Sequence, residues 1–283
     1  MEINKIGVIG AGTMGNGIAQ VCAAAGKQVV MVDISADAVA RGLKTLAGSL
    51  DRLVKKEKIS AADKDATLAR IQGSTAYADL ADVDLVIEAA TENESLKLRI
   101  LKDIEAVVRP DAIIASNTSS ISITRLAAAL QHPARAIGMH FFNPVPLMAL
   151  VELISGLQTA ESTIEASRAF ALAVGKTPVA VKNSPGFVVN RLLCPMINEA
   201  IFVYQEGLAS AADIDEAMKL GCNHPIGPLA LADMIGLDTM LSVMEVFYQG
   251  FNDSKYRPAP LLREMVDAGY LGRKSGQGFY SYS

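Results

Sequence analysis

The sequence predicts an α/β fold over residues 1–184, followed by a smaller all-α domain over residues 185–283. Three observations support this prediction. Apolar runs of strand length alternate with longer amphipathic stretches through the first part of the chain, which is typical of a parallel sheet covered by helices. A turn-forming segment, Lys-Asn-Ser-Pro-Gly, occupies residues 182–186. Beyond it, apolar residues recur at a spacing near 3.6, as they do in helices.

The individual elements follow from the same patterns. We expect strands at residues 5–9, 28–33, 84–89, 112–116, 134–140 and 150–154, with a last sheet-forming segment near residues 177–181. Helices are expected in the first domain at residues 14–25, 95–108 and 123–130. In the second domain they are expected at residues 187–205, 211–220, 229–236 and 237–251. Breaks between these last helices are marked by Gly207, Gly221, Pro225, Gly227 and Pro228.

One segment departs from the alternation of strands and helices. Residues 36–71 form a long stretch of helical character between two predicted strands. Ser60 and Asp63 have the spacing of a capping box, which divides the stretch into two helices. Within two turns the stretch also places four cations, Arg52, Lys55, Lys56 and Lys58. A basic cluster in a chain of net charge −4 favours a phosphorylated ligand, and a solvated helix face of mixed charge is the alternative.

Composition argues against several classes of function. The net charge of −4 and the pI of about 5.5 give no general attraction to nucleic acid or to an anionic membrane. Cys22, Cys194 and Cys222 are odd in number and scattered, so we expect reduced packing residues and no disulfide. Cys222 and His224 lack a second ligand pair, so no metal site is expected. Glu2 stands where a signal peptide is basic, and no membrane span is found, so we expect a cytoplasmic protein.

A glycine motif joins the first predicted strand to the first predicted helix. The residues are Gly10-Ala11-Gly12-Thr13-Met14-Gly15. The first glycine allows a tight turn, the second lets the backbone approach a pyrophosphate, and the third lets the helix pack closely on the strand. Asp33 ends the next strand about 20 residues on, where a carboxylate accepts hydrogen bonds from an adenosine ribose. This spacing predicts a Rossmann-type dinucleotide-binding domain. Because a carboxylate repels a 2′-phosphate, NAD is favoured over NADP.

Two residues near the ends of later strands are candidates for acid–base chemistry. His140 ends one predicted strand beside Phe141 and Phe142, and an imidazole can take the proton of an alcohol as hydride leaves the carbon. Glu152 lies within the apolar run 149–154, where an unpaired charge is costly. A neighbouring strand would bring this carboxylate to the far nitrogen of His140 and stabilise the imidazolium. The pairing fails if Glu152 lies on an exposed edge.

Taken together, the motifs resemble those of the L-3-hydroxyacyl-CoA dehydrogenases, in particular the stand-alone bacterial 3-hydroxybutyryl-CoA dehydrogenases, over essentially the whole chain. The motifs are GAGTMGNGIAQ at 10–20, the polar cluster at 88–93, SNTSS at 116–120, HFFNPVP at 140–146, NSPGFVVNR at 183–191, HPIGPLAL at 224–231 and GRKSGQGFY at 272–280. The resemblance implies reversible, NAD-dependent oxidation of an L-3-hydroxyacyl-CoA, with 3-hydroxybutyryl-CoA and acetoacetyl-CoA as the expected pair. It also implies that His140 and Glu152 are the catalytic pair.

The resemblance implies further site residues that pattern alone does not single out. Ser119 and Asn190 are implied as catalytic and substrate contacts, with Ser119 near the 3-oxygen and the nicotinamide. Ser49 and Lys56 are implied to hold the coenzyme A moiety, with Lys56 at its phosphates. The implied NAD contacts are Gly10, Gly12, Thr13, Met14, Gly15, Asp33, Glu92, Lys97, Asn117 and Asn143.

We also expect a homodimer, because an apolar helical module of about 100 residues commonly buries a face against a second copy. Two other functions stay open on the sequence. A two-domain 3-hydroxyacid or sugar-acid dehydrogenase acting on a free carboxylate would share the nucleotide motif but would not need Lys56. A non-catalytic dinucleotide-binding protein could keep the fold without activity. The intact set of His140, Glu152, Ser119 and Asn190 argues against this last reading.

Overall fold

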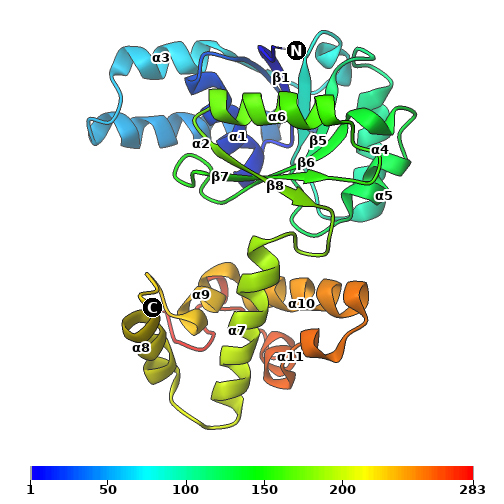
Figure 1. Cartoon of the computed structure of the whole chain (residues 1–283). Helices are drawn as coiled ribbons and strands as arrows, with labels where there is room; N and C mark the ends of the chain where they lie inside the picture. The colour runs from blue at the N-terminus through cyan, green and yellow to red at the C-terminus, as the bar shows by residue number, and fades with distance from the viewer. Residues whose placement is uncertain (1, 283) are drawn as a thin grey trace. The chain divides into compact units, whose positions relative to one another are not determined.

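An eight-stranded sheet organises the first part of the chain in a computed structural model, which describes residues 2–282 (Figure 1). Its spatial order is β3-β2-β1-β4-β5-β6-β7-β8. The strands are β1 Lys5–Ile9, β2 Gln28–Val32, β3 Ile71–Ser74, β4 Leu85–Glu88, β5 Ile113–Ser116, β6 Ala136–Phe141, β7 Leu150–Ser155 and β8 Thr177–Lys182. Neighbouring strands are parallel except for β6 and β7, which are antiparallel. The strand order reverses between β1 and β4, where such sheets bind ligands.

The α/β class is confirmed, with two differences in the sheet. β3 is not among the predicted strands, because it is a short edge strand in which Ile71 is the only large apolar residue. β7 departs from an all-parallel sheet. Only residues 142–149 connect it to β6, which is too short a connection for a parallel crossover.

Helices cover both faces of this sheet. They are α1 Thr13–Ala24, α2 Ala36–Lys55, α3 Ala61–Ala69, α4 Glu94–Glu105, α5 Ile123–Ala128 and α6 Glu161–Ala173, with short 3₁₀ turns η1 Tyr77–Leu80 and η2 Pro133–Arg135. α1, α2 and α6 share one core, to which they contribute Ile18, Leu46 and Phe170. On the opposite face α4 and α5 pack through Leu101 and Leu126. α6 is not among the predicted helices, because many of its apolar positions are alanines with weak periodicity.

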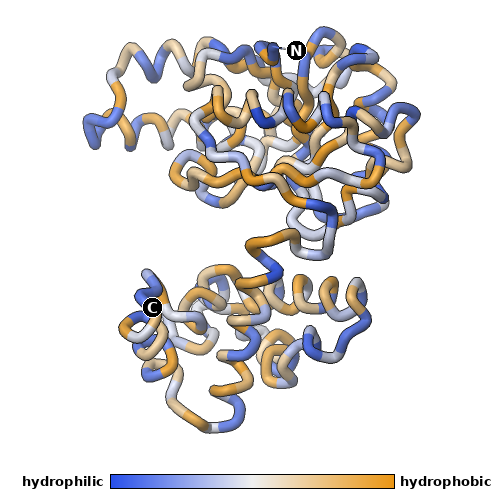
Figure 2. Tube along the Cα trace, in the orientation of Figure 1, coloured by the Kyte–Doolittle hydropathy of each residue, from blue (hydrophilic) through white to orange (hydrophobic). Residues whose placement is uncertain are grey.

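α2 and α3 form the predicted helical excursion, called the arm below. Ser60 caps α3 and forms the predicted capping box with Asp63. Along the arm, hydrophilic and hydrophobic colours alternate, as expected for helices with one buried face (Figure 2). Gly42 of α2 lies against the glycine motif: a Cβ at this position would be 2.7 Å from both the Cβ and the carbonyl oxygen of Ala11. A side chain here would therefore push the arm away from the motif.

From Pro185 on, the chain forms a second unit, which is helical. Its helices are α7 Val189–Gln205, α8 Ala211–Cys222, α9 Pro228–Ile235, α10 Leu237–Phe251 and α11 Pro260–Asp267, of which α11 is not among the predicted helices. Ile197, Leu229 and Phe247 lie in its core. The buried carboxylate of Asp215 accepts hydrogen bonds from the N–H groups of Leu229 and Ala230 and so caps α9 from α8.

The three cysteines differ in their surroundings. Cys22 and Cys194 are buried, as expected of packing residues, and burial raises the pKa of each thiol to about 12. Cys222 is exposed, so the expectation of a packing role is wrong there, because the last turn of α8 faces solvent. Within residues 2–282, no group of three or more His, Cys, Asp or Glu side chains is arranged to hold a metal ion. None of the helices described is long and apolar enough to cross a membrane.

Candidate active site

The glycine motif connects β1 to α1 with the geometry that a dinucleotide requires. Gly10 has a φ of +98°, in the region that favours glycine. A Cβ at Gly15 would lie 1.7 Å from the carbonyl oxygen of Gly10, so only glycine fits where the helix begins. A Cβ at Gly12 would meet no protein atom within 4 Å. The space above Gly12 is therefore open to a ligand, and α1 directs its N-terminal N–H groups toward it.

Asp33 follows β2 and lies beside this motif. Its carboxylate accepts hydrogen bonds from the N–H groups of Ala11 (2.6 Å) and Ile34 (2.7 Å). With Gly10 and Tyr77 it lines a cavity of about 240 Å³. Burial raises the pKa of the Tyr77 hydroxyl, with a contribution from nearby carboxylates. The cavity and the open face of the motif fit the adenosine and pyrophosphate parts of a dinucleotide.

A second cavity, of about 200 Å³, lies at the carboxyl ends of β4 and β5. Met14, Glu92, Lys97 and Asn117 are on its wall, together with residues 89–91. The Oδ1 atom of Asn117 accepts a hydrogen bond from the Phe141 N–H at 2.8 Å, which connects this wall to β6. Four of the residues implied for cofactor binding are thus brought together.

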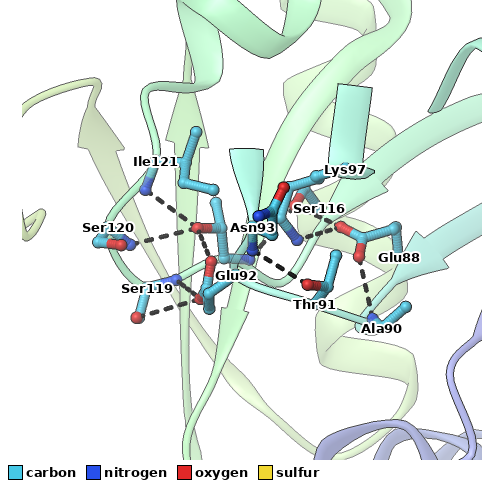
Figure 3. A network of polar contacts seen from close by, with 11 residues as sticks. Glu88, Ala90, Thr91, Glu92, Asn93, Lys97, Ser116, Ser119, Ser120 and Ile121 are labelled. Atoms are coloured by element: carbon cyan, nitrogen blue, oxygen red, sulfur yellow. Dashed lines mark hydrogen bonds and ion pairs between the residues drawn. The ribbon is translucent and has the colours of Figure 1, made fainter. Parts of the chain in front are cut away.

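Glu92 also organises the SNTSS segment after β5 (Figure 3). Its carboxylate accepts hydrogen bonds from the hydroxyl of Thr118 (2.7 Å) and from the N–H (2.8 Å) and hydroxyl (3.2 Å) of Ser119. Glu92 itself is exposed and Ser119 is half-buried. Ser119 is therefore held next to the second cavity by a residue on its wall.

His140 and Glu152 face each other across the antiparallel pair β6 and β7. The Nδ1 atom of His140 lies 2.8 Å from Oε2 of Glu152, and the two residues are 6% and 1% exposed. Glu152 is not on a sheet edge, because β8 covers β7 on its other side. The expected contact is present. With Nδ1 committed to the carboxylate, Nε2 is the atom that can exchange a proton with a ligand. The ring of Phe142 lies 4.3 Å from the imidazole, measured between centroids, and is tilted against it by 49°.

The segment from residue 142 to residue 149 follows His140 and carries Asn143, which is exposed. Lys176, which directly precedes β8, holds this segment in place. Its buried ammonium donates hydrogen bonds to the carbonyl oxygens of Val145 (2.5 Å) and Met148 (2.8 Å). Burial lowers the pKa of Lys176. This lysine is not among the site residues predicted from the sequence. Its only signal was a cation directly before an apolar strand.

The remaining site residues lie elsewhere in the chain. Ser49 is half-buried on α2, and Lys56 is exposed at its C-terminus. Arg52 is three residues from Ser49 and four from Lys56, so the three share one helix face. Asn190 lies in the first turn of α7, within the helical unit, and is half-buried. Asn190 thus belongs to the helical unit, whereas His140 belongs to the first unit.

Known families match both units. Residues 5–184 match the NAD binding domain of 3-hydroxyacyl-CoA dehydrogenase, and residues 186–282 match the C-terminal domain of the same enzyme. The chain belongs to the 3-hydroxyacyl-CoA dehydrogenase family. This confirms the family that the sequence motifs resemble, and NAD is the cofactor that the matched N-terminal domain binds.

Individual members of the family are similar along their full length. The chain is 55% identical over 280 residues to a 3-hydroxybutyryl-CoA dehydrogenase of Bradyrhizobium diazoefficiens, covering 99% of this chain and 96% of that protein. It is 48% identical over 279 residues to a 3-hydroxybutyryl-CoA dehydrogenase of Clostridioides difficile, covering 99% of each. The crystal structure of an (S)-3-hydroxybutyryl-CoA dehydrogenase from Ralstonia eutropha covers 100% of both chains, with 67% identity and a TM-score of 0.98.

Proposed function

We propose that this chain catalyses the reversible, NAD-dependent oxidation of an L-3-hydroxyacyl-CoA to a 3-oxoacyl-CoA, with 3-hydroxybutyryl-CoA and acetoacetyl-CoA as its substrate pair. The observation that carries the proposal is the buried pair of His140 and Glu152, 2.8 Å apart, within the part of the chain that matches an NAD binding domain. Full-length similarity to enzymes named 3-hydroxybutyryl-CoA dehydrogenase supports the choice of substrate.

Proton transfer in this mechanism belongs to His140. In oxidation its Nε2 atom takes the proton of the 3-hydroxyl group, and in reduction the imidazolium returns that proton to the 3-oxygen. NAD, when bound, accepts the hydride from C3 in one direction and supplies it in the other. Glu152 keeps the proton of the imidazole on Nδ1 and stabilises the imidazolium by its charge. The ring of Phe142 keeps water from competing for the proton.

Binding is divided among separate parts of the chain. Asp33 holds the adenosine ribose, and its charge disfavours NADP. The nicotinamide side is held by Glu92, Lys97, Asn117 and Asn143, with the glycine motif at the pyrophosphate. Ser119 and Asn190 orient the substrate, so their loss misplaces the reacting carbon. Ser49 and Lys56 of the arm hold the coenzyme A moiety. The helical unit forms a homodimer with a second copy.

Substrate and cofactor choice together test this function. The purified protein is assayed for oxidation of reduced cofactor with acetoacetyl-CoA and with free acetoacetate, each with NADH and with NADPH. We expect turnover of the CoA thioester and a higher kcat/KM with NADH. Comparable turnover of free acetoacetate would favour a dehydrogenase of free hydroxyacids, and no oxidation with either compound would favour a non-catalytic nucleotide-binding protein.

The role of His140 gives a first mutational prediction. We expect His140→Gln to lower kcat by about 10²- to 10⁴-fold, the usual contribution of general acid–base catalysis, with little change in NADH affinity. His132 is exposed and supplies the matched control, so His132→Gln should keep wild-type kcat. Steady-state kinetics with acetoacetyl-CoA measures both variants. Near wild-type turnover in His140→Gln would remove His140 from the mechanism.

A further inference from the structure

Glu88 is the last residue of β4 and takes no part in the proposed catalysis or ligand binding. Its side chain is fully buried. The Oε1 atom accepts a hydrogen bond from the Ala90 N–H at 2.9 Å. The Oε2 atom accepts one from the Ser116 hydroxyl at 2.9 Å and another from the Lys97 ammonium (Figure 3). One carboxylate thus joins β4, β5 and α4 at the edge of the sheet where the second cavity lies.

Lys97 connects this carboxylate to the cavity. The lysine is only 1% exposed, yet it is on the wall of the cavity of about 200 Å³. Among residues 2–282, Glu88 is the only hydrogen-bond partner of its ammonium. A lysine ammonium carries three N–H donors. Donors of Lys97 therefore remain for a ligand in the cavity.

Packing alone does not account for this ion pair. Removing two charges from water costs free energy, and a pair of apolar side chains of similar volume is often as stable or more stable. The pair lies at the carboxyl edge of the sheet, beside the point where the strand order reverses. An ion pair placed there is expected to serve a ligand.

We propose that Glu88 is a positioning residue of the NAD site: its carboxylate holds the Lys97 ammonium on the wall of the second cavity, so that the remaining N–H groups donate to the bound cofactor. This inference rests on the proposed function and extends it to a residue that does not itself touch the ligand. The hydrogen bonds from Ser116 and Ala90 fix the carboxylate, and Glu88 itself is not among the residues on the cavity wall.

Glu88→Gln separates the charge from the shape of this side chain. The amide keeps the volume, but the buried ammonium of Lys97 loses its counter-charge and gives up its proton more easily. A neutral amine is a weaker donor than an ammonium. In this variant, NADH affinity should therefore fall as pH rises from about 6 to about 9, whereas wild-type affinity should change little.

Other ionisable groups near the pair do not account for such a change. They are Glu92 on the cavity wall, Glu94 and Asp103 on α4, Tyr77 on η1, Asp33 after β2 and His140 on β6. Carboxyl groups ordinarily titrate near pH 4 and phenols near pH 10. The imidazole of His140 is present in every variant compared, so its titration cancels in the comparison.

The experiment measures the Kd of NADH by fluorescence titration at several pH values. The proteins are wild type, Glu88→Gln, Lys97→Met and the double variant. We expect Glu88→Gln to raise Kd on the order of 10-fold at pH 8, as for loss of a charge-assisted contact, and less at pH 6. Lys97→Met should raise Kd by a similar factor with no such pH dependence. The double variant should bind no more weakly than Lys97→Met.

Two further variants complete the test. Asp84 lies just before the N-terminal end of β4, away from Glu88. Its carboxylate accepts hydrogen bonds from the N–H groups of Asn4 and Lys5 and from the Arg109 guanidinium. Asp84→Asn should therefore leave the Kd of NADH unchanged. Ser116→Ala removes one anchor of Glu88 without changing charge. If Glu88→Gln does not fold, Ser116→Ala should still raise the Kd of NADH, and only when Lys97 is present.

Failure of this inference differs from failure of the proposed function. A Kd unchanged in Glu88→Gln at every pH, or effects of Glu88→Gln and Lys97→Met that add in the double variant, would overturn the role of Glu88. So would a Kd in Ser116→Ala that matches wild type. Absence of NADH binding by the wild-type protein would instead overturn the proposed function.

Discussion

At the residue scale, the pairing of His140 and Glu152 predicts that turnover depends on the charge of the Glu152 carboxylate and not only on its shape. Glu152→Gln preserves the shape, but the amide cannot stabilise an imidazolium and does not select the imidazole tautomer. We expect kcat to fall by at least about 10²-fold, within the range of acid–base effects, with NADH affinity maintained. The exposed Glu165 on α6 gives the matched control, Glu165→Gln, which should keep wild-type kcat. A kcat of Glu152→Gln close to that of the control would show that the carboxylate is not needed.

Some residues of the candidate site have a signal in the sequence and others do not. His140 and Glu152 stand out because one is a rare residue at a strand end and the other is a charge in an apolar run. Glu88 also ends an apolar strand, but its partner Lys97 reads as an ordinary helix cation. Lys176 bonds backbone carbonyl oxygens 28 and 31 residues away, which no pattern of side chains encodes. Buried polar contacts between distant segments therefore need the structure.

At the element scale, the arm carries a prediction about substrate binding. Lys56 directly follows α2, where an exposed ammonium can contact the phosphates of coenzyme A. We expect Lys56→Glu to raise the KM for acetoacetyl-CoA roughly 3- to 10-fold, as befits reversal of an exposed charge, and to leave the Kd of NADH unchanged. Steady-state kinetics at low and high salt measures the effect, which should shrink with salt.

A second charge on the same helix controls for net charge. Lys44 is exposed on α2 but does not share the face of Ser49 and Lys56. Lys44→Glu should therefore leave the KM for acetoacetyl-CoA near the wild-type value. If Lys44→Glu and Lys56→Glu raise this KM equally, the arm attracts the substrate only through its overall charge, and the specific role of Lys56 is wrong.

The end of α4 carries a prediction about acid stability. Glu105 accepts hydrogen bonds from the N–H groups of Gln131 and His132 and from the Arg135 guanidinium. Burial acts to raise the pKa of this carboxyl, but these donors together hold it below its usual value of 4.5. The stability it supplies is thus complete above about pH 4.5 and is lost as pH falls through the lower, folded-state pKa.

Glu105→Gln tests this link between α4 and the segment before β6. We expect the variant to lower the free energy of unfolding by about 1–3 kcal/mol at pH 7, as for loss of charged hydrogen bonds in a mostly buried site. The difference from wild type should diminish below about pH 4, where the carboxyl of the wild type takes up a proton. Urea denaturation at pH 7 and pH 3.5 measures it. An equal difference at both pH values would contradict the assignment.

Elements were predictable where their own residues determine them. The glycine motif, the capping box of α3 and the strands β1 and β4 have local signals that the structure reproduces within about two residues. β3 and the antiparallel direction of β7 lack such signals. An edge strand needs little apolar surface, and strand direction follows from the length and path of a connection. These features depend on where the rest of the sheet lies.

At the scale of the whole molecule, the helical unit leaves apolar surface uncovered in the single chain. Leu192, Leu208 and Leu220 are 71%, 76% and 77% exposed. A cavity of about 470 Å³ lies between α7 and α8. It is lined mostly by apolar residues, among them Met196, Val203 and Leu208. Exposed apolar surface of this kind is typical of interfaces, and in the proposed homodimer the same surface of a second copy would cover it symmetrically.

Dimerisation through this surface gives the last prediction. The wild type should sediment at micromolar concentration with twice the chain mass of 29.9 kDa. Leu208→Asp places a charge where the second copy would pack, so this variant should sediment as a monomer, since an unpaired charge in an interface is costly. Leu172 is 60% exposed on α6 of the other unit, and Leu172→Asp should stay dimeric. A wild-type protein that sediments as a single chain would contradict the homodimer. A Leu208→Asp variant that remains dimeric would show that the dimer forms through a different surface.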